Sequence, residues 1–386
     1  MLFRSKNPDA GAEWRTEKTG SGVTLSMGFS EKEQFGLVRW RHDLEIEVPN
    51  AGAYFTVTHT VTNESAVTRD LMFWSNAMIS PGPGNMRVSS LSSLDHQVVF
   101  DRAITRTYNH NNNLNQTFWG DGLGGPGSEG NPWDVVNWPV HTGRLTSGRT
   151  VTLDVSLLSN WYEYDLKFAG LFAKGGLSGR TSGTYLGQYN LTADEGVVKL
   201  FPAEIVPGTP TGAKYWHWGS FSQDASWSFA DGDSTYAELM TGPARVFQEP
   251  TSDPASTAGS HPTGEPYAVP VAAGESLTWR ETFLAPWGIG GITEADSDGA
   301  YFFDRTIIEA TRYRVLAGYF PAEKRSGLTV RILQGDTVVF EESGLQAGPG
   351  RNPAPLFREL ELRLSSSAPL TLEITDSDGT VKRIDE

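Results

Sequence analysis

An all-β fold is predicted for this chain of 386 residues, and three observations carry the prediction. Glycine (42) and proline (22) are plentiful and aromatic residues make up 11% of the chain, which is typical of many strands joined by turns. Apolar and polar residues alternate with a period of two in many segments, the pattern of a half-buried strand. No segment has a helical stripe bounded by caps, and 305–313, which comes nearest, is short.

The expected strands fall into two groups along the chain. The first group contains 23–29, 44–48, 54–62, 150–157, 197–201, 236–240 and 277–284. Composition changes at about 292–304, and the second group contains 313–317, 328–333, 337–342, 359–364 and 370–374. The spacing of the second group, with turns at Gly335 and Gly379, suits a small Ig-like β-sandwich. We therefore predict two domains, 1–298 and 299–386.

Two long stretches between the strands lack the alternation. Residues 107–148 contain two histidines and three tryptophans, and we expect this stretch to shape a site, since long loops inside a compact domain are commonly functional. Residues 249–268 are rich in Pro, Ser, Thr and Gly, and we expect a surface excursion there.

Charge and cysteine content exclude several classes of function. A formal net charge of −15 disfavours nucleic acid and an anionic membrane surface as partners. The chain has no cysteine, which excludes disulfides, thiolate metal sites and a cysteine nucleophile. No apolar run is long enough for a transmembrane span, and residues 1–20 lack the apolar region of a signal peptide, so a cytoplasmic location is favoured. The chain starts without a clear first strand, so we expect the natural chain to extend further N-terminally.

Neither a metal nor a cofactor is expected. Residues 231–233 and 376–379 look like fragments of calcium loops, but neither completes the spacing of such a loop, and turn chemistry explains both. There is no His-Glu-x-x-His, no phosphate-binding Gly-x-x-x-x-Gly-Lys and no Gly-x-Ser-x-Gly. A zinc protease, a P-loop NTPase and an α/β-hydrolase are therefore disfavoured.

Three stretches of the expected strands combine aromatic rings with a carboxylate or an imidazole. They are KYWHWG (214–219), DGDSTYAELMTG (231–242) and WRETFLAPWG (279–288). A sugar-binding surface needs this mixture, because flat apolar rings stack on the C–H faces of a sugar and a few polar groups fix its hydroxyls. A charged group on such a face is costly to desolvate unless it has a partner or a function. The stretches therefore predict a carbohydrate partner.

An ordered series of short motifs resembles an uncharacterised bacterial family of the galactose-mutarotase-like superfamily, often found next to tetratricopeptide repeats. The motifs, between about residues 20 and 290, are FWSNA (73–77), DEGVV (194–198), KYWHWG, DG (231–232), YAEL (236–239), Gly242, Gln248, WRE (279–281) and Pro286. The resemblance implies a supersandwich, two large antiparallel sheets packed face to face, with a sugar-binding cleft on one concave sheet. This fold serves epimerases, lyases and non-catalytic modules, so the resemblance leaves the reaction open.

Two departures from the pattern matter. Members of the family usually carry a further N-terminal region. Sugar mutarotases place a catalytic glutamate two residues before a glutamine on a late strand, and with Gln248 as that glutamine the matching position is Val246. Classical mutarotation is therefore not expected.

Glu281 is the first catalytic candidate. In the strand 279–283 it shares a face with Trp279 and Phe283, and desolvation between two rings is expected to raise its pKa, as suits a general acid. The alternative is a structural ion pair with an Arg or Lys of a neighbouring strand.

Glu238 is the second candidate, on one face with Tyr236 and Met240. The alternative is a buried carboxylate that supports a turn. If Glu238 and Glu281 faced one cleft, they could form the carboxylate pair of a glycosidase.

His217 is the third candidate and alternates with Trp216 and Trp218. Either the two indoles bind the sugar and His217 is core, or His217 lines the cleft and the indoles are core. A histidine in the cleft could protonate a sugar oxygen near neutral pH.

The remaining candidates would bind the substrate. The stacking and hydroxyl-binding candidates are Trp74, Asn76, His110, Lys214, Trp216, Trp218, Gln248 and Trp279. His59 is expected to be a core histidine. Taken together, these residues predict a carbohydrate-active enzyme that acts on a glycosidic or hemiacetal linkage by acid–base chemistry. The alternatives are a carbohydrate-binding protein without catalysis and a structural module.

Overall fold

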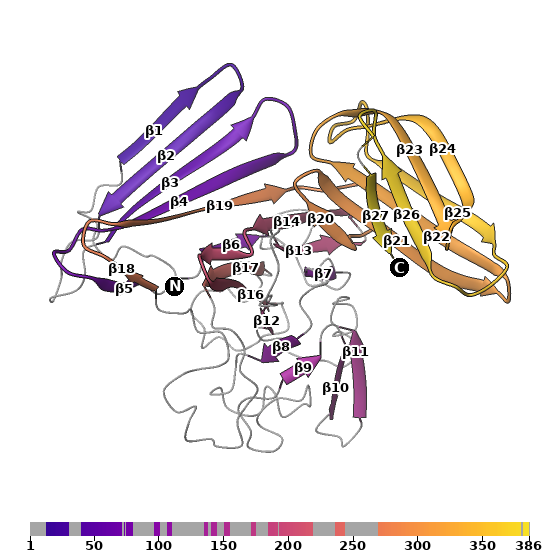
Figure 1. Ribbon diagram of the computed structural model, residues 1–386, viewed down its shortest axis with the longest axis horizontal. Coiled ribbons are helices and arrows are strands. Elements are labelled where there is room, and N and C mark those ends of the chain that lie inside the picture. Colours follow the sequence, from indigo (N-terminus) through magenta and orange to yellow (C-terminus); the bar gives the residue numbers. More distant parts are fainter. Residues whose placement is uncertain are drawn as a thin grey trace.

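The chain folds as an all-β protein, as predicted from its composition and alternation. The computed structural model describes residues 13–30, 40–71, 73, 75–79, 96–100, 106–109, 135–137, 140–144, 150–154, 171–174, 184–191, 193–218, 236–243, 269–379 and 381–385. All regular structure in these residues is β-strand, and none of them belongs to a helix that could cross a membrane. The strands form two large sheets, two small sheets and a C-terminal pair of sheets (Figure 1).

The first large sheet has 8 strands, all antiparallel to their neighbours. In spatial order they are β1 (Glu13–Lys18), β2 (Gly22–Ser30), β3 (Trp40–Pro49), β4 (Tyr54–Asn63), β19 (Ser276–Leu284), β14 (Glu195–Phe201), β13 (Thr184–Asn190) and β7 (His96–Phe100). The late strand β19 lies between β4 and β14, so it connects the N-terminal hairpins to the middle of the chain.

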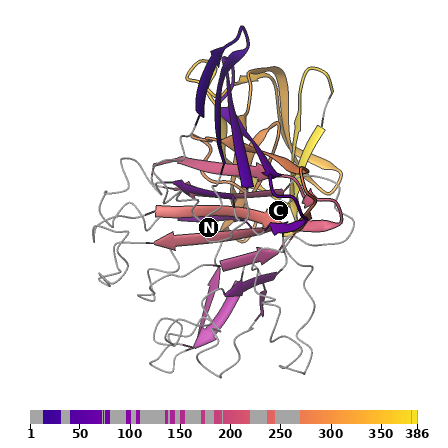
Figure 2. The same cartoon turned by 90° about the vertical axis from the view of Figure 1, so that its left-hand side faces the viewer.

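The second large sheet has 7 strands. In spatial order they are β6 (Ser75–Ile79), β17 (Tyr236–Pro243), β16 (Thr209–Trp218), β12 (Leu171–Lys174), β8 (Arg106–Asn109) and β9 (Val135–Asn137), with β15 (Glu204–Val206) also paired to β16. The small sheets are β10 (Val140–Arg144) with β11 (Thr150–Asp154), and β18 (Val269–Val271) with β5 (Arg69–Leu71). Figures 1 and 2 show β1–β4 and β8–β11 extending from opposite sides of the body.

The long stretches between strands differ in part from expectation. The stretch 107–148 was expected to be irregular, but it contains most of β8 and all of β9 and β10. These strands are only three to five residues long, so a period of two is not evident among the surrounding Gly and Asn residues. The second stretch, 249–268, lies outside the described residues.

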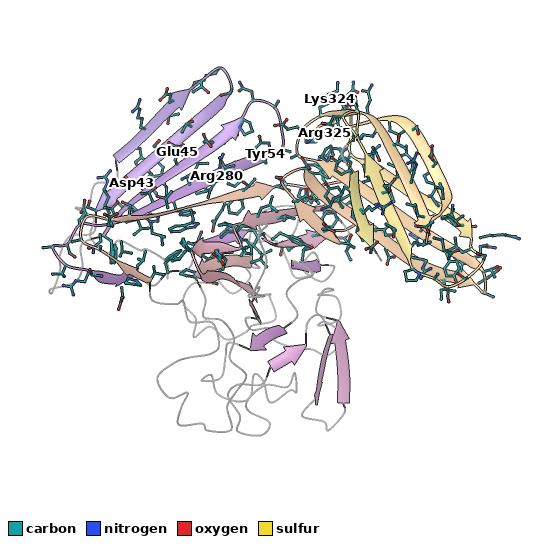
Figure 3. The ribbon with its side chains drawn as sticks, viewed as in Figure 1. Asp43, Glu45, Tyr54, Arg280, Lys324 and Arg325 are labelled. Atoms are coloured by element: carbon teal, nitrogen blue, oxygen red, sulfur yellow. The ribbon has the colours of Figure 1, made fainter. Side chains whose placement is uncertain are left out.

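Alternation gives the first sheet one apolar and one polar face. In β19, Trp279, Glu281 and Phe283 share one face, as the alternation predicts, and that face is buried toward the second sheet, while Arg280 is exposed on the other face. Figure 3 labels Asp43, Glu45 and Arg280 on this polar face, where the guanidinium of Arg280 forms an exposed ion pair with Glu47 at 2.7 Å. Such exposed pairs stabilise little, so the polar face is a solvated surface.

The apolar face of the first sheet builds the core between the sheets. One cluster of buried residues includes residues of β3, β4 and β19: Trp40, Val61, Leu71, Phe73, Ile205, Val269, Val271 and Trp279. It joins both large sheets and the small β18–β5 sheet. The two large sheets are therefore packed face to face, as the predicted supersandwich requires.

The Asp194 turn between β13 and β14 binds the segment that follows β19. Asp194 has a φ of 55°, and its carboxylate accepts hydrogen bonds from Tyr189 Oη at 2.5 Å and from the amide of Gly290 at 2.7 Å. The amide of Gly288 donates to the carbonyl of Asp194 at 2.8 Å. The DEGVV motif is thus explained locally, because a short polar side chain tolerates the left-handed turn and holds the next segment.

The C-terminal region is a sandwich of two four-stranded sheets. One sheet is β20 (Glu294–Asp296), β21 (Gly299–Glu309), β22 (Arg312–Pro321) and β25 (Leu356–Arg363); the other is β24 (Thr337–Ala347), β23 (Arg325–Gln334), β26 (Leu370–Thr375) and β27 (Val381–Asp385). The expected domain boundary after residue 298 falls in the turn between β20 and β21. The Ig-like character of this sandwich remains a prediction.

A shared apolar core joins the C-terminal sandwich to the first large sheet. Its buried residues come from both parts of the chain: Val99, Tyr185, Tyr189, Val198, Leu284, Ile289, Ile292, Ala295, Ala300, Phe320 and Ala322. At the same junction Tyr54 Oη donates to Glu323 at 3.1 Å, and the amide of Ala53 donates to the carbonyl of Ala322 at 3.1 Å. The sandwich is therefore anchored by buried contacts.

Candidate functional site

The register of β16, β17 and β6 places the predicted sugar-binding positions on one face of the second sheet. Trp216 pairs with Glu238, which pairs with Met78, and these three positions share a face. Residues two positions away along each strand share it too: Lys214, Trp218, Tyr236, Met240 and Asn76. The strands thus bring positions from three of the predicted motifs to one surface, which we call the indole face.

The opposite face of these strands turns toward the first sheet. Leu239 and Thr241 have no exposed surface, and Thr241 contacts Glu281 of the first sheet. His217 pairs with Ala237 and so shares the face of Leu239. The register therefore places positions 216 and 218 on the face opposite to Leu239, and position 217 on the face that Leu239 shares.

The register also separates the two candidate carboxylates. Position 238 belongs to the indole face, whereas Glu281 lies in β19 of the first sheet and contacts the inner face of β17. Because these two positions do not lie on one surface, they cannot form the carboxylate pair of a glycosidase. Three other predicted site residues, Trp74, His110 and Gln248, lie outside the described residues.

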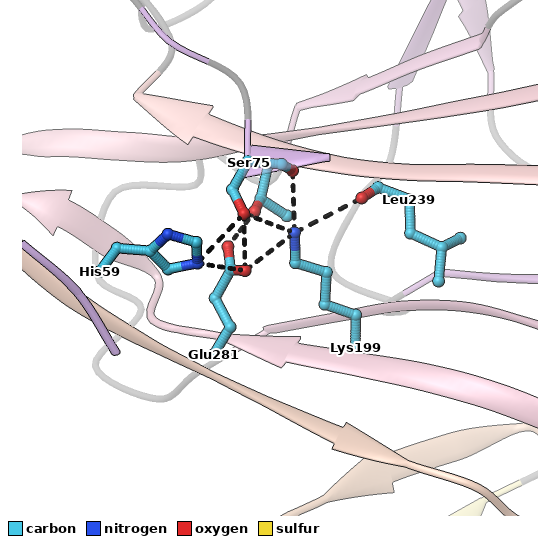
Figure 4. A network of polar contacts seen from close by, with 6 residues as sticks. His59, Ser75, Lys199, Leu239 and Glu281 are labelled. Carbon is cyan, nitrogen blue, oxygen red and sulfur yellow. Dashed lines mark hydrogen bonds and ion pairs between the residues drawn. The ribbon is translucent and has the colours of Figure 1, made fainter. Parts of the chain in front are cut away.

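Glu281 is the centre of a buried polar network between the sheets (Figure 4). Its Oε1 accepts a hydrogen bond from Thr241 Oγ1 at 2.5 Å, and its Oε2 accepts one from Ser75 Oγ at 2.7 Å. Lys199 Nζ lies 3.1 Å and His59 Nε2 3.3 Å from the same Oε2. Lys199, the nearest cation, comes from β14, the strand beside β19.

The pKa of Glu281 corrects the expectation from the sequence. Burial alone would raise it, but Lys199, His59 and the hydroxyl of Thr241 together lower the pKa of Glu281 to about 2. At neutral pH this carboxylate therefore carries no proton to donate. The structure instead contains the alternative considered above, a structural ion pair between Glu281 and a lysine of a neighbouring strand.

Lys199 is the partner that the sequence analysis missed. Burial lowers its pKa and Glu281 opposes that shift. Its Nζ nevertheless has several oxygens within 3.4 Å, the carbonyls of Ser75 at 2.9 Å and Leu239 at 3.4 Å besides Glu281, which is the environment of an ammonium group. The available signal was a charged residue between Val197 and Phe201 on one face of an apolar strand.

Trp279 lies inside the core. Its ring stacks on His59 at 4.7 Å between centroids and on Phe73 at 4.3 Å, and only 5% of the residue is exposed. With both ring faces covered, it offers no surface to a sugar, and we assign it to packing. His59 is itself buried, in agreement with the expected core histidine.

His42 extends this stack and makes stability depend on pH. Its ring lies 5.8 Å from that of His59, and burial, with a smaller contribution from His59 and against the attraction of Asp43, lowers the pKa of His42 from 6.5 to about 4. Above pH 6.5 the histidine is neutral in both states; as pH falls toward 4 only the unfolded chain takes up the proton, so stability is lost in that window.

We expect this to cost about 3 kcal/mol of unfolding free energy between pH 6.5 and 4, and we expect His42→Gln to remove that part of the pH dependence. Urea unfolding of both proteins across this range measures the difference. Parallel pH profiles for the two proteins would contradict it.

Among the described residues, no group of three His, Asp or Glu lies close enough to hold a metal ion. The indole face carries one carboxylate position, Glu238: it is the only acidic residue in β6, β17, β16, β12, β8 and β9. Within these described strands, Glu238 is therefore the carboxylate that we consider for acid–base chemistry.

Comparison with known proteins finds partial structural matches at low sequence identity. No protein-family model and no curated protein matches the chain. Among solved structures, a TPR-domain containing protein from Parabacteroides distasonis is 16% identical with a TM-score of 0.40, over 71% of this chain and 34% of that protein. The chain thus spans about a third of that protein's length.

Two further structures carry the name of the expected superfamily. A galactose mutarotase-like protein from Clostridium acetobutylicum has a TM-score of 0.38 at 10% identity, over 72% of this chain and 67% of that one. A galactose mutarotase related enzyme from Lactobacillus acidophilus has a TM-score of 0.37 at 8% identity, over 71% of each chain.

Proposed function

We propose that this chain is a carbohydrate-active protein whose sugar lies on the indole face of β6, β17 and β16. The observation that supports the proposal is the register, which groups positions Trp216 and Trp218 with Lys214, Asn76 and Glu238 on the face opposite to Leu239 and Thr241. Two tryptophan positions two residues apart on one face of a strand are the spacing that an apolar platform for a sugar ring requires. A cation, an amide and a carboxylate beside it supply the donors and acceptors that sugar hydroxyls require.

Glu238 is the residue we assign to acid–base chemistry at this site. A glutamate there could donate a proton to a glycosidic or ring oxygen and later accept one. Cleavage or rearrangement of a glycosidic or hemiacetal bond requires at least this proton transfer. Glu281, buried and ionised, supplies no second acid. Because Glu281 cannot serve as a second acid, the second candidate function is carbohydrate binding without turnover.

Binding to a glycan array followed by product analysis on the bound glycans tests the proposal. We expect Trp216→Ala to weaken binding roughly 30-fold, the loss typical of a central aromatic contact. The matched control is Trp14→Ala, since Trp14 is 63% exposed in β1 of the other sheet and should leave affinity unchanged. Equal effects of the two substitutions, or no binding by the unmodified chain, would contradict the proposed site.

Product analysis separates the two candidate functions. If the chain is an enzyme, Glu238→Gln should retain binding and lose roughly 100-fold or more in rate. If no bound glycan is converted by the unmodified chain, the binding protein without catalysis is the correct assignment.

A further inference from the structure

The buried Lys199–Glu281 pair directs most of its contacts to the two strands that carry Asn76 and Glu238. Glu281 accepts hydrogen bonds from Ser75 of β6 and Thr241 of β17. Lys199 donates to the carbonyl of Ser75 in β6 and, at 3.4 Å, to that of Leu239 in β17. Figure 4 shows these groups converging on the two charges from the second sheet. The pair itself belongs to β14 and β19 of the first sheet, so it ties one sheet to the other.

Strand β6 depends on this tie more than a central strand would. Among the strands that the structure describes, it is at the edge of the second sheet and pairs with β17 alone. An edge strand has one row of ladder hydrogen bonds to fix it, so its position rests on further contacts. Ser75, at its first position, makes three such contacts: its hydroxyl contacts both Glu281 and Lys199, and its carbonyl contacts Lys199. Asn76 follows directly and belongs to the indole face.

A charged pair can fix a position that apolar packing would leave looser. Buried ion pairs often contribute no more stability than apolar residues of the same volume, but they require particular partners at particular distances. Here the pair has four polar partners on β6 and β17, all within 3.4 Å. An apolar pair would impose no such requirement on the offset of these strands against the first sheet.

We propose that Lys199 and Glu281 are positioning residues for the sugar site, holding β6 and β17 from beneath so that Asn76 and Glu238 keep a fixed separation. This inference rests on the proposed function, because it assigns to the pair a role in binding at the indole face. Neither residue touches the sugar. Their effect passes through Ser75, Leu239 and Thr241, which sit on the inner faces of the same strands.

Thr241→Val tests the inference without unpairing a buried charge. It removes the 2.5 Å hydrogen bond to Glu281, keeps the side-chain shape, and leaves Lys199 in place. The matched control is Thr56→Val: Thr56 is also buried and also donates to a glutamate, Glu47 at 3.1 Å, but it lies in β4 on the polar face of the first sheet. Thr241→Ser, which retains the hydroxyl, is the rescue variant.

Two readouts follow for each variant, at a temperature where all remain folded. We expect Thr241→Val to weaken glycan affinity about tenfold, which is at the lower end of the losses seen when a residue that orients a binding group is removed. We also expect it to speed amide hydrogen exchange in β6 and β17. Thr56→Val should leave both unchanged, and Thr241→Ser should restore both. Unaltered affinity and exchange in Thr241→Val would overturn the inference, as would equal effects of Thr56→Val.

Hydrogen exchange keeps this test separate from that of the proposed function. If the unmodified chain binds no glycan, the proposed function fails. Faster exchange in β6 and β17 of Thr241→Val alone would then still support the positioning of these strands by the pair. Unchanged exchange would overturn it.

Discussion

Replacing Lys199 with methionine is expected to destabilise the protein by about 3–5 kcal/mol, the largest loss we expect from a single substitution. The substitution leaves the carboxylate of Glu281, which is 1% exposed, without its cation. The remaining donors, Ser75, Thr241 and His59, satisfy its oxygens but do not replace the positive charge of Lys199. Urea unfolding at pH 7 measures the loss.

A second substitution and a matched control test the cause. Adding Glu281→Gln to Lys199→Met removes the unpaired charge, so the double variant should recover much of the loss although it carries two changes. Arg280→Met removes the cation of an exposed pair with Glu47 and should cost about 1 kcal/mol or less. A double variant less stable than Lys199→Met would show that the loss does not come from the unpaired carboxylate.

Phe320→Ala is the second substitution with a large expected effect. Phe320 of β22 has no exposed surface and belongs to the core that joins the C-terminal sandwich to β13, β14 and β19. Truncating a fully buried phenylalanine typically costs about 3–5 kcal/mol. Because the core is shared, we expect both parts of the chain to unfold together in the unmodified protein, in one urea transition that moves to lower urea in the variant.

Phe357→Ala is the control for that experiment, since Phe357 lies on β25 of the same sandwich but is 36% exposed, and a smaller shift is expected. Two separate transitions in the unmodified protein, of which Phe320→Ala moved only one, would contradict the shared core. The coupling between the sandwich and the large sheets matters for function, because the shared core includes Val198 of β14, the strand that carries Lys199.

The strands were largely predictable because their signal is local. The alternation in 277–284 predicted both β19 and the shared face of Trp279, Glu281 and Phe283, but not that this face is buried between the sheets. β1, with the sequence EWRTEK, was not expected, because an edge strand that is mostly charged has no apolar stripe to reveal it. Its Trp14 is largely exposed, so even its one aromatic residue does not report a core.

The candidate site was only partly predictable because it depends on contacts between distant strands. Alternation showed that His217 opposes the two indoles, but only the pairing of β16 with β17 and the burial of Leu239 indicate which side is inner. The pKa of Glu281 was expected in the wrong direction for the same reason. Its environment is decided by Lys199, 82 positions earlier in the chain (281 − 199), whose own strand gave no hint of its partner.

The structure of the chain bound to its tightest glycan from the array tests the central claim most directly. We predict that the sugar lies on the indole face, with a ring stacked on Trp216 or Trp218 and a hydroxyl or anomeric oxygen within hydrogen-bonding distance of Glu238. In that structure Glu281 should keep its contacts with Lys199 and Thr241 and make none with the sugar. A glycan bound on the polar face of the first sheet, or one in direct contact with Glu281, would contradict the account.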